Sequence, residues 1–180
     1  GIIVLPEDAP VGQPASEYYQ LDSDWLIDID ITANRADALS HYGVARDLYA
    51  WLTQNGYETS LHRPSCDAFK VDNHDLPIDV TIENTDACRR YACLSITDCE
   101  VKESPQWLKD KLNVIGLRPI NNIVDITNYI MMAYGQPMHC FDADMVKGHH
   151  IIVKDNNEGK KFVTLDGEEH ILGEHDLAIC

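Results

Sequence analysis

The stretch SPQWLKDKLNVIGLRPINNIVDITNYIMMAYG, residues 104–135, decides how this chain folds. Ser104-Pro105 is an N-cap and first-turn pair, and the apolar residues after it recur at helical spacing as far as Gly116. A second set at the same spacing follows the caps Asn121-Asn122 and ends at Gly135. These apolar residues are Leu108, Leu112 and Ile115 in the first set and Ile123, Ile126, Ile130 and Tyr134 in the second. The sequence therefore predicts two consecutive helices.

Segments on both sides of the helices alternate between apolar and polar residues, as strands do. The predicted strands are 78–83 and 91–97 before the helices, and 151–153, 162–165, 170–172 and the start of one at 176–179 after them. Asp166-Gly167 predicts a hairpin turn. This order predicts a mixed α/β (α+β) domain, in which strands, two segregated helices and a β-meander follow one another, unlike a doubly wound sheet.

Nearer the N-terminus, residues 27–31 alternate as a strand, and 37–52 predict a helix. We expect this helix to have its cap at Asn34, a break at Gly43 and its end at Gly56. The predicted organisation is a connector from an upstream segment at 1–24, a small strand-helix unit at 25–58, a linker at 59–76 and a domain at 77–180 that is truncated at its C-terminus.

The chain has 180 residues, of which 44% are hydrophobic, so it is long enough to form a sizeable core. Thirty acidic against fourteen basic residues give a formal charge of -16, which repels phosphate at long range. A free-standing nucleic-acid binder is therefore disfavoured. Six irregularly spaced cysteines without a CxxC motif indicate reduced thiols rather than a disulfide framework.

The densest group of polar residues lies in and after the second predicted helix. It comprises Arg118, Asn121, Asn122, Asp125, Thr127, Asn128 and His139. Caps and turns alone explain most of these residues. His139 follows a rigid Gly135–Met138 turn that would position its side chain accurately. Cys140 beside it suggests a thiol nucleophile, but adjacent strand residues point to opposite faces. His149-His150 match no common zinc spacing, and no glycine-rich phosphate loop is present.

Several longer stretches carry a resemblance to a known family. They are DITANRAD at 30–37, GVARD at 43–47, CRRY at 88–91, GLRPINNIVDITNY at 116–129, GQPMHCFD at 135–142 and TLDG at 164–167. In this order they resemble the beta subunit of bacterial phenylalanyl-tRNA synthetase. The family usually has proline where this chain has Ala33 and Ala36, and often alanine in place of Cys140.

The resemblance implies that residues 1–24 lead out of an upstream OB-fold domain and that 77–180 are the N-terminal part of an editing domain. This domain hydrolyses tyrosine wrongly esterified to the phenylalanine tRNA. By motif, Arg118 and Asn128 correspond to substrate-binding residues and Thr127 and His139 to catalytic ones, with no metal. We expect Arg118 to contact the terminal adenosine, Thr127 and Asn128 to bind the amino acid or a water, and His139 to orient the attacking water. The residues that complete the family's pocket follow the TLDG element and are expected beyond Cys180.

The resemblance also implies partners and a location. These are the alpha subunit in a heterotetramer, the 3′ end of the tRNA, a cytoplasmic setting without a membrane, and ATP and Mg for the holoenzyme but no cofactor for this segment. Two other hypotheses stay open from the residues: a structural module for assembly of the synthetase, without autonomous activity, and an unrelated thiol or metal hydrolase that uses His139 and Cys140.

Overall fold

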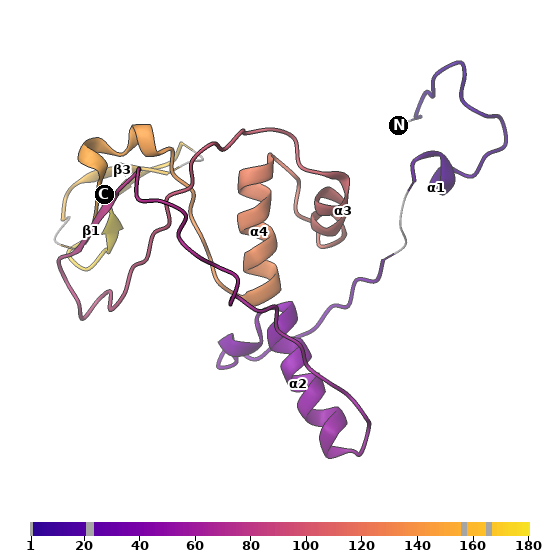
Figure 1. Ribbon diagram of the computed structural model, residues 1–180, viewed down its shortest axis with the longest axis horizontal. Coiled ribbons are helices and arrows are strands. Elements are labelled where there is room, and N and C mark those ends of the chain that lie inside the picture. The colour runs from indigo at the N-terminus through magenta and orange to yellow at the C-terminus, as the bar shows by residue number, and fades with distance from the viewer. Residues whose placement is uncertain (1, 21–23, 156–157, 165–166) are drawn as a thin grey trace. The chain divides into compact units, whose positions relative to one another are not determined.

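The computed structural model describes residues 2–20, 24–155, 158–164 and 167–180. The chain forms two compact units (Figure 1). The first, here called the helical unit, comprises Gly1–Leu61 and Val101–Met138. The second, here called the sheet unit, comprises His62–Glu100 and His139–Cys180. Together the helices and small sheets confirm the predicted α+β class.

In the helical unit, two helices from the deciding stretch lie side by side. Its elements are α1 (Ala15–Tyr18), the 3₁₀ turn η1 (Ala36–Ala38), α2 (His41–Gln54), α3 (Gln106–Val114) and α4 (Asn122–Tyr134). Figure 1 shows α3 beside α4. Leu108 and Leu112 are one helical turn apart on α3 and are almost completely buried. Burial of each leucine contributes roughly 1.5–3 kcal/mol.

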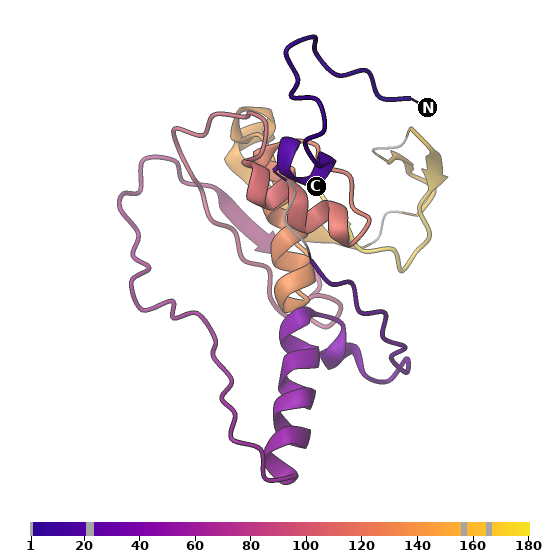
Figure 2. The ribbon, with the colours of Figure 1, turned by 90° about the vertical axis from the view of Figure 1, so that its right-hand side faces the viewer.

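The start of α2 meets the end of α4 (Figure 2). The Nδ1 of His41 donates to the carbonyl oxygen of Met132 at 3.0 Å, and the rings of Tyr42 and Tyr134 lie 6.1 Å apart. The hydrogen bond satisfies one of the last carbonyls of α4, which have no partner within their own helix. The two helices are thus joined at their ends.

The helix predicted at 37–52 begins later and differs in two details. Ser40, rather than Asn34, is the N-cap, and its Oγ accepts from the N–H of Gly43 at 2.9 Å. Gly43 lies buried within α2 and does not break it, because its missing side chain leaves room for the backbone of η1. The predicted end at Gly56 is confirmed, since this residue has a φ of 81° directly after the helix.

The ends of α3 and α4 largely agree with the prediction. Gly116 and Gly135 have φ angles of 78° and 77° where the helices end, and Asn121 caps α4 by accepting from the N–H groups of Ile123 and Val124. Ser104 does not cap α3. Its hydroxyl donates to Asp125 instead, a contact across the fold that local sequence does not reveal.

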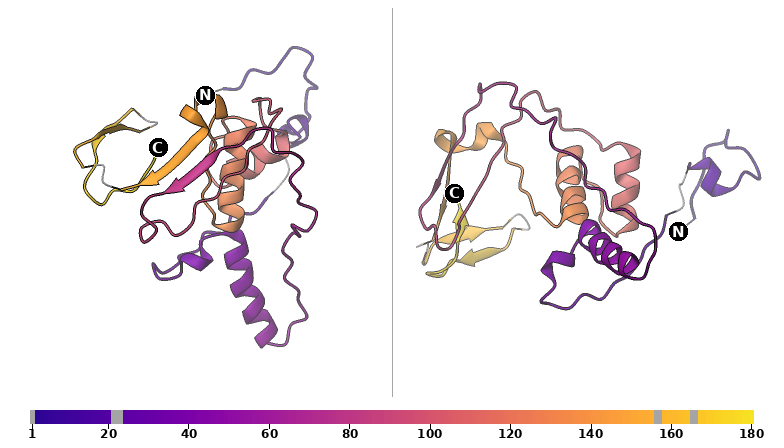
Figure 3. Two further views of the ribbon diagram at one scale, coloured as in Figure 1. Left: turned by 60° about the vertical axis from the view of Figure 1, so that its left-hand side comes forward. Right: turned by 60° about the horizontal axis from the view of Figure 1, so that its bottom comes forward.

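The sheet unit contains a three-stranded sheet in the order β1-β2-β5 and a separate two-stranded sheet, β3-β4. The strands are β1 (Asp79–Ile82), β2 (His150–Lys154), β3 (Lys161–Val163), β4 (Glu169–Ile171) and β5 (Ala178–Ile179), and the turns η2 (Ala143–Met145) and η3 (Lys147–His149) precede β2. Figure 3 shows β1 and β2 side by side, and their pairing is parallel. Ile151 and Val153 of β2 are buried.

Most predicted strands are confirmed in position, and two are wrong. The segments 27–31 and 91–97 form no strand, and Ile27 and Ile96 are largely exposed. Neither segment has a paired neighbour among the residues that the structure describes, and alternation without a ladder of hydrogen bonds does not make a strand. The β3-β4 hairpin is present, but Leu165 and Asp166 of its predicted strand end and turn lie outside the described residues.

The predicted linker at 59–76 contains no helix or strand, and 1–24 contains only the four-residue α1 among its described residues. The compact units divide the chain differently from the predicted ranges 25–58 and 77–180, because α3 and α4 group with α2. The compact units show which segments contact one another and do not test where one domain ends and the next begins. The predicted boundaries therefore stay a prediction. No helix in the described part of the chain is long and apolar enough to span a membrane.

Candidate functional site

The carboxyl group of Asp125 joins three segments of the helical unit. Asp125 lies on α4 and is fully buried. Its Oδ2 accepts from the hydroxyl of Ser104 before α3 at 2.5 Å, and its Oδ1 accepts from the N–H of Ile120 at 2.9 Å. Buried carboxylates need such donors because burial removes their water. Asp125 therefore fixes the loop that follows Arg118 relative to α4.

The neighbouring asparagines also have structural roles. Asn121 caps α4, as described above. Asn122 exchanges two hydrogen bonds with Lys102, since its N–H donates to the Lys102 carbonyl at 2.9 Å and its Oδ1 accepts from the Lys102 N–H at 3.0 Å. These contacts tie the segment before α3 to the start of α4. Three residues of the predicted polar group are thus explained by architecture.

Arg118 differs from the other cations of the helical unit. It is exposed, and among the described residues it makes no hydrogen bond or ion pair. Four other cations of this unit are held in ion pairs, namely Arg35, Arg46, Lys109 and Lys111. In a chain with a formal charge of -16, a guanidinium without an acidic partner is available for an external anion or ring. Its backbone is held by the Asp125 contact two residues further on.

Thr127 and Asn128 are half-buried on α4. The Thr127 hydroxyl donates to the carbonyl of Val124 at 2.7 Å, so its proton is used within the helix and its oxygen remains an acceptor. The Asn128 amide makes no hydrogen bond with any residue that the structure describes. It can both donate and accept. The pair offers the polar groups that a small ligand or water would need.

His139 is exposed at the start of a segment of the sheet unit. Its ring stacks on Phe141, with centroids 6.1 Å apart and an interplanar angle of 28°. Arg118, Thr127 and Asn128 belong to the helical unit. The structure thus brings three of the four predicted residues into one unit, and the common pocket with His139 stays a prediction.

The cysteines are all free, as predicted. Cys140 is exposed. Burial raises the pKa of the Cys93 thiol, which disfavours the reactive thiolate there. In the part of the chain that the structure describes, no three His, Cys, Asp or Glu side chains are arranged to hold a metal ion. The thiol or metal hydrolase hypothesis therefore gains no support from geometry.

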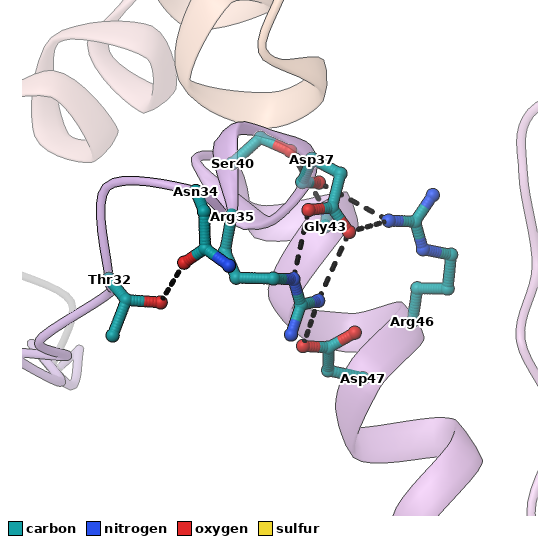
Figure 4. Close-up of polar contacts among 8 residues, drawn as sticks. All are labelled: Thr32, Asn34, Arg35, Asp37, Ser40, Gly43, Arg46 and Asp47. Atoms are coloured by element: carbon teal, nitrogen blue, oxygen red, sulfur yellow. Dashed lines mark hydrogen bonds and ion pairs between the residues drawn. The ribbon is translucent and has the colours of Figure 1, made fainter.

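A second group of polar residues surrounds the start of α2 (Figure 4). This group was not predicted from the sequence. Arg35 donates to both carboxylate oxygens of Asp37, at 2.9 and 3.0 Å, and to Asp47 at 2.5 Å. Arg46 donates to Asp37 at 2.5 Å. The alternating charges near a helix start were the available signal. Because these arginines are neutralised by carboxylates, the group is a structural clamp rather than a binding site for anions.

This clamp makes a pH prediction. The hydrogen bond from Arg35, followed by the charges of Arg35 and Arg46, lowers the pKa of the Asp37 carboxyl below its ordinary value of 3.8. A lowered folded-state pKa contributes stability that is present above the unfolded-state pKa and is lost as pH falls through the folded-state value. We therefore expect Asp37→Asn to lower Tm at pH 7 and to have a smaller effect as pH falls through the lowered folded-state pKa, where wild type itself becomes protonated.

Differential scanning calorimetry from pH 2 to 7 measures this difference. A matched control is Asp110→Asn on α3, whose carboxylate accepts from Gln106 and makes no ion pair with any residue that the structure describes. A Tm difference for Asp37→Asn that is constant over the whole pH range would contradict the assignment of the ion pairs.

Comparison with known proteins places these features in a family context. A protein-family model described as the B3/4 domain matches residues 87–180. Over its full length the chain is 63% identical to the phenylalanine–tRNA ligase beta subunit of Bacteroides fragilis. It is 59% identical to that of Bacteroides thetaiotaomicron and 53% identical to that of Porphyromonas gingivalis. In each case all of this chain aligns, and it spans 22% of the relative's length.

Proposed function

Since this chain belongs to the B3/4 domain family and corresponds to a segment of phenylalanine–tRNA ligase beta subunits, we propose that it forms part of a proofreading site. The site would hydrolyse tyrosine that has been esterified to the phenylalanine tRNA. The observation that carries the proposal is Arg118, a guanidinium without a polar partner among the described residues, on a loop fixed by Asp125. Thr127 and Asn128 on α4 supply further polar groups.

Physical chemistry explains why such a second site is useful. A synthetic pocket shaped for phenylalanine rejects an analogue that merely adds a hydroxyl by only about 10²-fold. A separate site that hydrogen-bonds the hydroxyl rejects phenylalanine by a far larger factor, because its polar groups would otherwise stay unsatisfied. The overall discrimination between phenylalanine and tyrosine is then the product of two factors, one from binding in the synthetic pocket and one from hydrolysis in the second site.

The proposed roles follow the chemistry of ester hydrolysis. Arg118 contacts the terminal adenosine region, and Thr127 with Asn128 binds the amino acid or a water. His139 orients the attacking water. An aminoacyl ester is activated enough that a positioned water and stabilisation of the developing oxyanion suffice, so no covalent nucleophile is required.

The partners are part of the proposal. We infer an alpha subunit within a heterotetramer, the 3′ end of the tRNA, and ATP with Mg for the ligation reaction elsewhere in the enzyme. The segment itself needs no cofactor for water-mediated ester hydrolysis. A cytoplasmic location agrees with the substrate class and with the free cysteines.

A second candidate is an assembly module whose pocket is inert. It is favoured by the apolar side chains of α2 that remain exposed, among them Leu48 and Trp51, which are 54% and 58% exposed. Exposed apolar side chains of this size are common at protein interfaces. The two functions are separated by activity measured in the assembled enzyme.

We expect His139→Ala, made in the assembled synthetase, to lower kcat for hydrolysis of tyrosyl-tRNA(Phe) by about 100-fold, since misplacing the attacking water costs about that much. Arg118→Ala should chiefly raise KM, by about tenfold, because it removes a binding contact. Release of labelled tyrosine from the mischarged tRNA measures both constants.

Cys140→Ala is the matched control for His139→Ala, since it alters the adjacent exposed residue. It should leave kcat and KM unchanged, and a chelator should have no effect on hydrolysis. If the wild-type assembly releases tyrosine no faster than buffer, the proofreading function is wrong and the assembly module is favoured. Loss of activity in Cys140→Ala would instead favour a thiol mechanism.

A further inference from the structure

The sheet unit carries two adjacent arginines without acidic partners. Arg89 and Arg90 are exposed, and neither guanidinium makes a hydrogen bond or ion pair with any residue that the structure describes. The chain has thirty acidic residues for fourteen basic ones. Arg89 and Arg90 are adjacent in sequence, and neither guanidinium is neutralised by a carboxylate of a described residue. The two residues are here called the Arg89–Arg90 patch.

The backbone that precedes this patch is held by a network centred on Asn84. Its Oδ1 accepts from the N–H groups of Asp86 and Ala87 at 3.0 and 3.1 Å. Its own carbonyl accepts from the N–H of Cys88 at 3.0 Å. Each contact closes the chain into a turn directly before Arg89. The side chain and the backbone carbonyl of Asn84 therefore define this turn.

The turn is also anchored to the three-stranded sheet. The Nδ2 of Asn84 donates to Asp155, the residue after β2, at 2.5 Å. The N–H of Glu83 donates to the carbonyl of Val153 at 2.9 Å, which continues the pairing of β1 with β2. On the far side, the Cys88 thiol donates to the Arg90 carbonyl at 3.6 Å. A fixed backbone lowers the entropy lost when the two side chains bind a ligand.

We propose that the Arg89–Arg90 patch binds the phosphodiester backbone of the single-stranded 3′ end of a tRNA, a role that rests on the proofreading function proposed above. Guanidinium groups match phosphate oxygens in bidentate geometry and stay charged at all physiological pH values. The surrounding net charge of -16 opposes RNA at long range. Local phosphate contacts of this kind would offset that repulsion and guide the strand.

The test uses the assembled synthetase with Arg89→Ser and Arg90→Ser combined. Two esters are compared, tyrosyl-tRNA(Phe) and the tyrosine ester of adenosine, which has no phosphate. We expect KM for the tRNA ester to rise about tenfold at 150 mM salt with kcat unchanged, whereas hydrolysis of the adenosine ester stays the same. The slope of log KM against log salt should fall by about 1.4, or roughly 0.7 for each single-strand phosphate.

A double variant with the same change in charge controls for the overall field. Arg63 and Lys70 are also exposed cations without a polar partner among the described residues, and they lie in the segment without helix or strand. Arg63→Ser with Lys70→Ser should leave KM and its salt slope unchanged. An equal rise in KM in both double variants would overturn the proposal, because the effect would then come from net charge alone.

The remaining outcomes also decide the question. An unchanged KM for the tRNA ester overturns the proposal, as does an equal loss with the adenosine ester, which would indicate damage to the fold. Weaker subunit assembly with unchanged tRNA binding would show an acidic protein partner instead. If wild type hydrolyses neither ester, the proofreading function fails, and salt-dependent binding of uncharged tRNA to wild type and the double variant still tests the patch.

Discussion

Asp125→Ala is expected to lower the free energy of unfolding by about 3 kcal/mol. The change removes two hydrogen bonds to a fully buried carboxyl, from Ser104 and from the Ile120 N–H. A hydrogen bond to a charged group contributes about 1.5–3 kcal/mol, and a buried donor left without an acceptor costs about 1–3 kcal/mol. Urea denaturation followed by tryptophan fluorescence measures the loss.

Asp125→Asn is the matched control, because it keeps the shape of the side chain and one acceptor oxygen. It should cost less than Asp125→Ala, and Ser104→Ala, which leaves the Ile120 contact in place, should also cost less. If Asp125→Ala unfolds at the same urea concentration as wild type, the carboxyl does not join the three segments. Under the proofreading function proposed above, the same substitution in the assembled synthetase should also weaken binding of the tRNA ester, since Asp125 holds the loop next to Arg118.

Gly43→Ala is expected to destabilise the junction of η1 and α2 by at least about 2 kcal/mol. Within an ordinary helix the same change stabilises by about 1 kcal/mol, because alanine has the higher helix propensity. Here a Cβ on Gly43 would lie 2.3 Å from the carbonyl oxygen of Asp37 and 2.7 Å from the Cα of Ala38. Both atoms belong to backbone, so neither can move aside without shifting η1.

Circular dichroism melting tests this reversal of sign. Ala50→Gly on the exposed surface of the same helix is the control, and propensity alone predicts a cost of about 1 kcal/mol for it. Gly43→Ala should lower Tm by more than this control does. A higher Tm for Gly43→Ala would mean that the close approach of η1 to α2 does not exist in solution.

The helices were the most predictable part of this fold. Gly116 and Gly135 end α3 and α4 as expected, and Asn121 caps α4 as expected, because these signals act through the backbone of a few neighbouring residues. The predicted cap at Ser104 was wrong for the opposite reason. Its hydroxyl reaches Asp125, which is 21 positions away in sequence and adjacent only after folding.

The strands were less predictable than the helices. Residues 78–83 and 27–31 show the same alternation, yet only the former contains a strand, β1, because β2 provides its hydrogen-bond partners. The parallel pairing of Asp79 with His150 joins segments separated by both long helices of the deciding stretch. Pairing of this kind depends on the path of the chain and leaves no local pattern.

The candidate site was also predicted from the sequence only in part. The long motifs around Arg118, Thr127 and His139 identified the family, and the comparisons confirmed that identification. Which of the clustered polar residues are structural was open in the sequence. Burial and contacts assign Asn121, Asn122 and Asp125 to the architecture and leave Arg118 and Asn128 with polar groups available to a ligand.

By itself, the sequence determined the α+β class, the two helices at 104–135 and membership of the family, because propensity, capping and motif identity are written into consecutive residues. Only the tertiary structure decided the parallel β1-β2 pair, the burial of Asp125 and the clamp between Arg35, Asp37 and Asp47. Each of these depends on groups brought together across the fold, and their energies arise from burial and pairing that no short stretch of chain contains.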